Sequence, residues 1–356
     1  MEISIIIRDL PYLKILHPVC LELHKLGVEY NLYHWDAPRG EKAYNNASLA
    51  NIKKSSPEVI KHANKVQVFS NDKQLRQYLL RDKASKLVSV EIALWGKPYT
   101  KFFRDHKIRP YSVLYLSDSI WGNSTKEMHK VYYTTKHLME THHKFSGVQY
   151  NKSRDRAFGS PIFDCLAQSS SGDDILVLLP NLRQEHVGIS FGSLDNFVKM
   201  IAKLSEGGDL IFKSRKKQWL PNEIRQYAKR IVYDGDKMYP STTSELLKQS
   251  CTTVMFYSSG IYECVYAGNY VVNIPFSIKR WGWDKQKLRQ YFSTEQNNLY
   301  QFDGVVESIG QKEILSDGWK FVPRKIDMTK QSEWIKRFVG VSKNSAKLIA
   351  EDIVRG

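Results

Sequence analysis

Residues 257–263 combine small polar side chains, a glycine and a carboxylate in a pattern that suits an anionic ligand. Ser258, Ser259 and Gly260 follow a short apolar run and precede a segment of helical length that ends at Gly268. Such a turn offers free backbone N–H groups and the positive end of the helix dipole to an anion. Glu263 lies in the first helical turn, where its carboxylate could accept hydrogen bonds from a ribose. The pattern favours a nucleotide diphosphate site, although a serine-capped structural corner uses the same residues.

The segment around this turn resembles the nucleotide-binding half of the GT-B superfamily of glycosyltransferases. That superfamily also contains non-hydrolysing nucleotide-sugar 2-epimerases and the polyol-phosphate transferases of teichoic acid synthesis. Their shared order is a strand, a turn with Ser and Gly, a helix carrying Glu, and a Gly-x-x-Val-Val strand. Here this order is FYSSG at 256–260, Glu263, and GNYVV at 268–272. Upstream, FGSPIFD at 158–164 resembles the connector between the two domains, and ILVLLP at 175–180 resembles the first strand of the second domain.

The length and periodicity agree with this resemblance. A chain of 356 residues exceeds one typical core, and short apolar runs alternate with amphipathic segments as in βαβ units. The resemblance implies an α/β fold of two Rossmann-like, doubly wound domains that face a cleft, with a C-terminal helix crossing back to the N-terminal domain. We expect an acceptor domain at 1–158, a linker at 159–174 and a nucleotide-sugar domain at 175–330. Residues 331–356 would form the returning helix.

The net charge of +16 predicts an acidic partner. Nucleic acid is an alternative of a different class, but no helix-turn-helix, zinc-finger spacing or RNA-recognition pattern is present, and the basic residues are scattered. A basic cleft for a nucleotide diphosphate, with further charge for an anionic glycan or a peripheral contact with an anionic membrane, explains the charge more simply. No run of 18 apolar residues occurs, and the four cysteines form no Cys-x-x-Cys pair. We therefore expect a cytoplasmic protein without structural zinc.

Ligands of open parallel sheets bind beyond the carboxyl ends of the strands, which selects the remaining candidates. In the second domain we assign donor binding to Arg183, Lys213, Arg215, Tyr239, Ser258, Ser259, Gly260 and Glu263. Lys213 and Arg215 would neutralise a diphosphate leaving group, as a transferase without a metal requires. They would otherwise be solvated loop charges.

The first domain would supply a general base for the acceptor hydroxyl. The candidates are Asp118, Asp9 and His17, of which Asp118 follows a clean apolar strand. Each also has a structural interpretation: Asp118 suits a helix N-cap, and His17 suits a partly buried helix position before Pro18. Adjacent histidines such as 142–143 point to different sides of a helix and chelate a metal poorly, so we expect no metal site.

Departures from the family patterns separate the possible reactions. In the epimerases a His-Arg-x-Glu-Asn segment follows the first strand of the second domain, whereas 182–186 is Leu-Arg-Gln-Glu-His. Tyr257 stands where those enzymes have the Asp before Ser-Gly-Gly. The paired catalytic histidines of the polyol-phosphate transferases are not recognisable. The sequence therefore favours a glycosyltransferase that moves a sugar from a nucleotide-sugar to a glycan or lipid-linked acceptor without a cofactor, with a non-hydrolysing 2-epimerase as the alternative.

Overall fold

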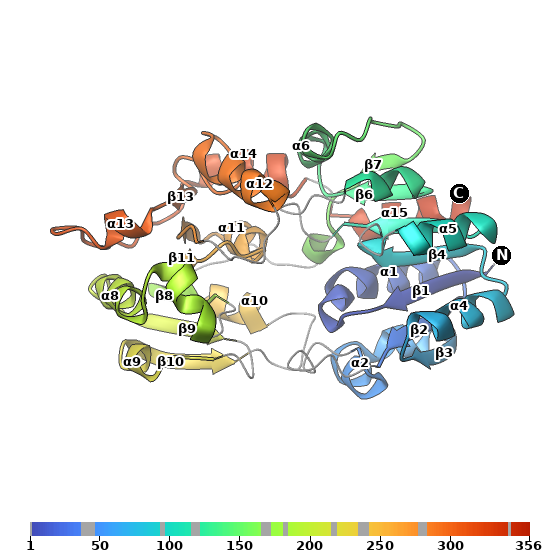
Figure 1. The fold of residues 1–356 in the computed structure, drawn as a ribbon, viewed down its shortest axis with the longest axis horizontal. Coiled ribbons are helices and arrows are strands. Elements are labelled where there is room, and N and C mark those ends of the chain that lie inside the picture. Colours follow the sequence, from blue (N-terminus) through green and yellow to red (C-terminus); the bar gives the residue numbers. More distant parts are fainter. Residues whose placement is uncertain are drawn as a thin grey trace. The chain divides into compact units, whose positions relative to one another are not determined.

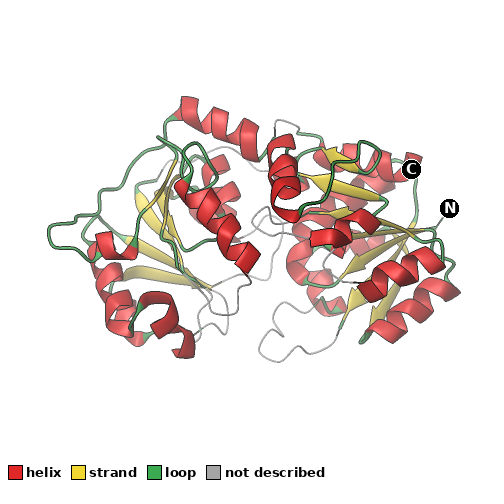
Figure 2. Ribbon diagram, turned by 45° about the horizontal axis from the view of Figure 1, so that its top comes forward, coloured by secondary structure: helices red, strands yellow, loops and turns green. Residues whose placement is uncertain are grey.

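The computed structural model describes residues 2–36, 47–92, 97–114, 122–164, 172–180, 184–214, 219–233, 242–276, 283–340 and 343–356. The chain divides into two compact units. The first comprises 1–165, 236–240 and 339–356, and the second comprises 166–235 and 241–338. Each unit is a parallel β-sheet flanked by helices (Figures 1 and 2).

The first unit holds a seven-stranded sheet in the order β3-β2-β1-β4-β5-β6-β7. Its strands are β1 (Ile3–Ile7), β2 (Tyr30–Trp35), β3 (Ala63–Phe69), β4 (Lys86–Val90), β5 (Arg109–Val113), β6 (Lys130–Tyr133) and β7 (Asp155–Ala157). Its helices are η1 (Leu10–Tyr12), α1 (Leu13–Lys25), α2 (Leu49–Ser55), α3 (Pro57–Lys61), α4 (Asp72–Arg81), α5 (Lys97–Asp105), η4 (Gly122–Glu127), α6 (Lys136–Ser146), η5 (Pro161–Asp164) and α15 (Ser345–Arg355). Every residue of β1 and β4 is buried, as expected for central strands covered on both faces.

The second unit holds a six-stranded sheet in the order β10-β9-β8-β11-β12-β13. Its strands are β8 (Asp174–Leu178), β9 (Leu210–Ser214), β10 (Ala228–Tyr233), β11 (Ser250–Met255), β12 (Tyr270–Asn273) and β13 (Val306–Ser308). Its helices are η6 (Gln184–His186), α7 (Val187–Phe191), α8 (Leu194–Ser205), α9 (Asn222–Arg225), α10 (Thr242–Leu247), α11 (Ile261–Ala267), α12 (Trp283–Thr294), α13 (Gln311–Ile314) and α14 (Met328–Phe338). The predicted fold class, two Rossmann-like doubly wound domains, is confirmed.

The strand order reverses at the same place in both sheets. The reversal lies between β1 and β4 in the first unit and between β8 and β11 in the second. Crossover helices leave opposite faces of the sheet at such a point, and the loops that follow the two strands diverge and leave room for a ligand. The residues that follow β1, β4, β8 and β11 are therefore the first to consider for function.

The segment 331–356, expected to return as one helix, is two helices that belong to different units. In α14, Trp334 is fully buried and Gln331 donates to the carbonyl of Val265 at 2.6 Å, so this helix packs in the second unit. Gly340, with φ +84°, follows α14. Only α15 packs in the first unit, where it lies against α1. A left-handed residue ends helical geometry, which explains the division.

The N-terminus of α15 is held by the last residue of the predicted connector motif. The carboxylate of Asp164 accepts the N–H groups of Ser345 and Ala346 at 3.0 and 2.7 Å. At the other end of the helix, the ammonium of Lys86 donates to the carbonyls of Ile353 and Val354. Both ends of α15 thus have charged partners that complement the helix dipole.

Candidate functional site

The turn that follows β11 has a strained backbone supported by the two neighbouring strands. Tyr257 adopts φ +45°, a left-handed conformation that costs about 1–3 kcal/mol for a bulky residue. Its N–H donates to the side-chain oxygen of Asn273 at 3.0 Å, and Asn273 is fully buried at the end of β12. The amide of Asn273 in turn donates to Ser308 Oγ at 2.9 Å. Hydrogen bonds from β12 and β13 therefore hold the turn in place without a ligand.

The predicted serine and glycine residues lie together in this turn. The N–H of Gly260 donates to Ser258 Oγ at 3.1 Å, and Ser258, Ser259 and Gly260 are all half-buried. A Cβ at Gly260 would lie 2.9 Å from Leu178 Cδ1, at the end of β8. Glycine thus lets the turn lie close to the reversal point of the sheet, where a larger residue would displace the Leu178 side chain.

The helix that carries Glu263 is buried along its whole length. All seven residues of α11 are buried, and Glu263 is only 6% exposed. A carboxylate this far from water is found only with polar partners. The structure therefore places Glu263 on the helix that directly follows the Ser258–Gly260 turn, with its side chain buried.

Three residues that the sequence analysis missed surround Tyr257. The Arg289 guanidinium lies 4.9 Å from the centre of the Tyr257 ring, and Ser293 Oγ donates to the tyrosine hydroxyl at 3.1 Å. Tyr300 packs edge-on against the same ring at 5.4 Å and donates to the carbonyl of Ser258 at 3.4 Å. Burial raises the pKa of Tyr257, although Ser293 and the Arg289 charge oppose this. Only the fold brings α12 and the segment after it to this turn.

The other donor-binding candidates fall partly outside the described residues. Lys213 is half-buried near the end of β9, where its carbonyl accepts the N–H of Leu179. Arg183, Arg215 and Tyr239 lie outside the described residues, as does Asp118 of the first unit.

In the first unit, a carboxylate directly after β4 was missed by the sequence analysis. Glu91 adopts φ +54°, is 6% exposed, and accepts a hydrogen bond from the Tyr12 hydroxyl at 3.2 Å. Burial raises the pKa of Tyr12, and the negative charges of Glu91 and Asp9 add to the effect. Asp9, predicted as a base, lies half-buried after β1. Both carboxylates therefore lie near Tyr12 at the reversal point of the first sheet.

The sequence analysis missed Glu91 because of its place next to an apolar run. Glu91 directly follows the run LVSV at 87–90, and a strand pattern of this kind takes it as the last residue of the strand. Its position at the carboxyl end of a strand was the available signal.

The predicted base candidate His17 lies within α1, is 7% exposed, and has its pKa lowered by burial despite the nearby Glu58 carboxylate. His17 is accordingly held neutral.

The described residues contain no helix long and apolar enough to cross a bilayer. They also contain no group of three or more His, Cys, Asp and Glu side chains arranged to hold a metal ion.

Comparisons with known proteins identify the fold. No family model and no curated protein matches the sequence. The chain is similar to the UDP-GlcNAc 2-epimerase of Methanocaldococcus jannaschii in complex with UDP-GlcNAc and UDP, with 100% of both chains covered, TM-score 0.59 and 12% identity. The corresponding epimerase of Neisseria meningitidis, bound to UDP-GlcNAc, covers 100% of both chains at TM-score 0.57 and 11% identity. Arabidopsis thaliana UGT89C1, complexed with UDP-L-rhamnose, covers 99% of both chains at TM-score 0.58 and 12% identity. The chain therefore has the GT-B fold.

Proposed function

We propose that the protein is a glycosyltransferase that moves a sugar from a nucleotide-sugar donor to a glycan or lipid-linked acceptor. The observation that carries this proposal is the turn 257–260, strained and fixed at the reversal point of the second sheet. A fixed turn that opens a helix at such a point suits the diphosphate of a nucleotide. Structures of the same fold hold UDP-GlcNAc, UDP or UDP-L-rhamnose, which supports a nucleotide-sugar as the ligand.

In this proposal the second unit binds the donor. The Ser258–Gly260 turn faces the diphosphate and Glu263 accepts the ribose hydroxyls. Because Glu263 is buried, a hydrogen bond to it forms in a low-dielectric environment and gains strength there. Lys213, with Arg183, Arg215 and Tyr239 as further candidates, stabilises the negative charge that develops on the leaving group. The cationic side chains among them, those of Lys213, Arg183 and Arg215, take the part that a metal ion plays in other transferases.

The first unit would supply the general base for the acceptor hydroxyl. Glu91 joins Asp9, Asp118 and His17 as a candidate because its carboxylate follows the central strand β4 and bonds to Tyr12. A carboxylate held in a fixed position can take a proton in the transition state without reorganising.

A non-hydrolysing 2-epimerase is the alternative, and the environment of Tyr257 argues against it. Tyr257 occupies the place of an epimerase aspartate, but its ring is packed under Arg289 and Tyr300. Burial raises its pKa, so the hydroxyl stays protonated at neutral pH and is a poor base.

A panel of nucleotide-sugars tests the proposal in two steps. We expect one or more of them to raise the melting temperature of the full chain, and the stabilising donor to release nucleoside diphosphate only slowly without an acceptor. The same incubation in deuterated water, followed by proton NMR, separates the two reactions. Deuterium at C2 of the recovered donor would favour the epimerase, and the absence of any stabilising nucleotide would contradict both.

A further inference from the structure

A polar hollow lies at the amino edge of the first sheet, at the opposite ends of the strands from the Glu91 site. Its lining includes the 147–152 loop, which joins α6 to β7, together with Lys126 before β6 and Arg154. Its volume is about 660 Å³. Pockets for small molecules typically measure about 300–1,000 Å³, so the hollow is large enough for a ligand.

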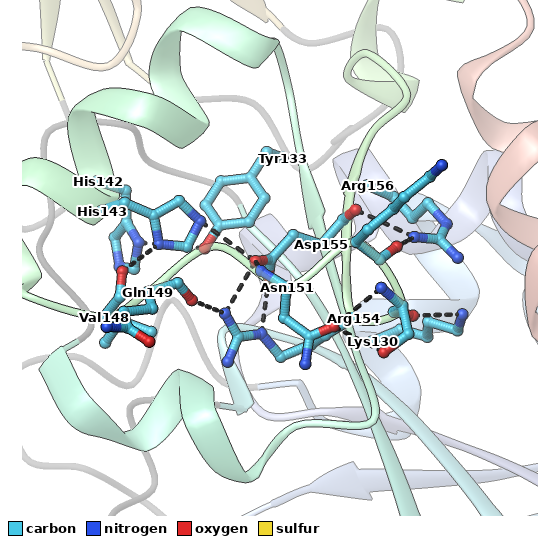
Figure 3. Close-up of polar contacts among 12 residues, drawn as sticks. Lys130, Tyr133, His142, His143, Val148, Gln149, Asn151, Arg154, Asp155 and Arg156 are labelled. Atoms are coloured by element: carbon cyan, nitrogen blue, oxygen red, sulfur yellow. Dashed lines mark hydrogen bonds and ion pairs between the residues drawn. The ribbon is translucent and has the colours of Figure 1, made fainter.

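The wall of the hollow is built on a buried ion pair. Arg154 and Asp155 are 6% and 3% exposed, and their side chains meet through two hydrogen bonds of 2.7 and 2.8 Å. Arg154 also donates to the carbonyl of Gln149 at 2.9 Å, and Asp155 accepts the N–H of Asn151 at 2.9 Å. Figure 3 shows these bonds converging on the base of the loop. The loop is therefore held in one shape, which lowers the entropy cost of binding.

The charges around the hollow favour an anion. Asp155 balances Arg154, whereas Lys126 and Lys152 are exposed at the rim. Residues 126–156 include seven Lys or Arg and three Asp or Glu. Of the two acidic residues besides Asp155, Glu140 lies 3.6 Å from Lys136, and the exposed Glu127 follows Lys126. Asp352 of α15 lies 3.8 Å from Arg156, which leaves six of the seven basic residues without that carboxylate. The excess of positive charge raises the local concentration of anionic ligands.

The exposed ring of Tyr150 favours a sugar among the possible anionic ligands. Tyr150 is 56% exposed, yet its ring packs edge-on against His143 at 6.1 Å. His143 is itself placed by Asp155, 3.2 Å from its Nε2, and by the carbonyl of Val148 at 2.7 Å from its Nδ1. An exposed tyrosine face suits the apolar C–H face of a sugar ring, and the neighbouring amide of Gln149 suits sugar hydroxyls.

We propose that this hollow binds an acidic saccharide, with the anionic group between Lys126 and Lys152 and the sugar ring on Tyr150. The proposal concerns binding alone and stands whether or not the protein transfers sugars. An inorganic anion would use only the lysines, and a neutral sugar would use only the aromatic and amide groups.

Calorimetric titration of the full chain tests the proposal. The probes are a disaccharide that contains glucuronic acid, its neutral glucose counterpart, and inorganic phosphate, at about 50 mM salt where screening is weak. We expect saturable binding of the acidic disaccharide, about tenfold or more tighter than either of the other two probes. Lys126→Gln with Lys152→Gln should weaken it about tenfold, since two charge-assisted contacts are lost. Tyr150→Ala should weaken binding of the acidic disaccharide and leave phosphate binding unchanged.

A matched control changes two exposed lysines on α2, Lys53→Gln with Lys54→Gln, and should bind like the unaltered chain. All substitutions are at exposed positions, and thermal unfolding verifies that each variant is folded. The proposal is overturned by absence of saturable binding, by phosphate or the neutral sugar binding as tightly, or by equal weakening in the control. It is also overturned if anionic vesicles or a single-stranded oligonucleotide displace the saccharide at tenfold lower concentration, which would assign the hollow to a lipid or a nucleic acid.

Discussion

Both sheets have a left-handed, non-glycine residue after an equivalent strand, but the side chains at the two positions differ in chemistry. In each sheet the strand beside the reversal point, β4 or β11, leads into a bulky left-handed residue, Glu91 at φ +54° or Tyr257 at φ +45°. In the first unit the strained residue presents a carboxylate to a tyrosine hydroxyl. In the second it turns the backbone so that Ser258–Gly260 open a helix. The comparison teaches that one kind of backbone strain can carry different side chains at equivalent edges, so any reaction there would depend on the side chains and not on the strain.

The largest expected effect comes from the first edge. Glu91→Gln keeps the shape and the contact with Tyr12 but removes the base, so turnover should fall by about 10²–10⁴-fold. Donor affinity should stay unchanged, because the donor is assigned to the other unit. Nucleoside diphosphate release and calorimetry measure the two quantities. Glu140→Gln, an exposed carboxylate on α6, is the control. Full turnover in Glu91→Gln would return the role to Asp9, Asp118 or His17.

The second edge should show the opposite pattern, a loss of binding. Glu263→Ala and Ser259→Ala should each weaken nucleotide affinity with the fold intact, and losing the carboxylate bonds to ribose should cost about 1.5–3 kcal/mol. Calorimetric titration with the nucleotide measures the loss. Glu245→Ala, an exposed glutamate on α10, serves as the matched control. Unaltered affinity in Glu263→Ala would mean that the donor site has been assigned wrongly.

The support under the second edge can be tested separately from its ligand contacts. Asn273→Ala should leave the N–H of Tyr257 without its acceptor and destabilise the second unit by about 1–3 kcal/mol. Urea unfolding followed by hydrogen exchange would localise the loss to residues 257–276. A loss confined to the first unit would show that the turn does not depend on Asn273.

A smaller difference between the units should appear with pH. Burial lowers the pKa of several histidines of the first unit, and for His142 the value falls to about 4. Other members of this group are His17, His34 and His129. The unfolded chain protonates these histidines more readily than the folded chain does. Above about pH 6.5 they are neutral in both states and do not affect stability, and as the pH falls below this value the folded state loses stability.

Hydrogen exchange at pH 7.5 and 5.5 checks this difference. The first unit should lose protection at the lower pH, and His142→Gln should reduce the loss. His106→Gln, at an exposed position, should not change it. Equal protection of the first unit at both values would contradict the assignment.

Much of the fold follows from the sequence because several strands are apolar runs and several helices end at glycine. The strands β1 and β4 coincide with apolar runs, the helix α11 lies between the Ser-Ser-Gly turn and Gly268 as expected, and Gly27 follows the first long helix with φ +69°. The segment 221–229, which is rich in polar helix-forming residues, contains only the short α9 and the start of β10. Pairing with β9 there outweighs local helical preference.

The site residues divide in a similar way. Residues close in sequence, such as Ser258–Gly260 and Glu263, follow from spacing along one turn. Arg289 and Tyr300 approach that turn from α12 and the segment that follows it, which only tertiary packing determines. The positive φ of Glu91 has no signature in hydrophobic periodicity, since a strand pattern counts side chains and not backbone angles.

The return of α15 to the first unit has a consequence for biosynthesis. A ribosome delivers β1 and α1 before the second unit, but the helix that lies on α1 emerges only after all of the second unit. Until then the apolar residues of α1 that α15 covers stay open to water or to a chaperone. The second unit, whose described core residues are nearly contiguous in sequence, is free to fold earlier, so the order of folding should reverse the order of translation.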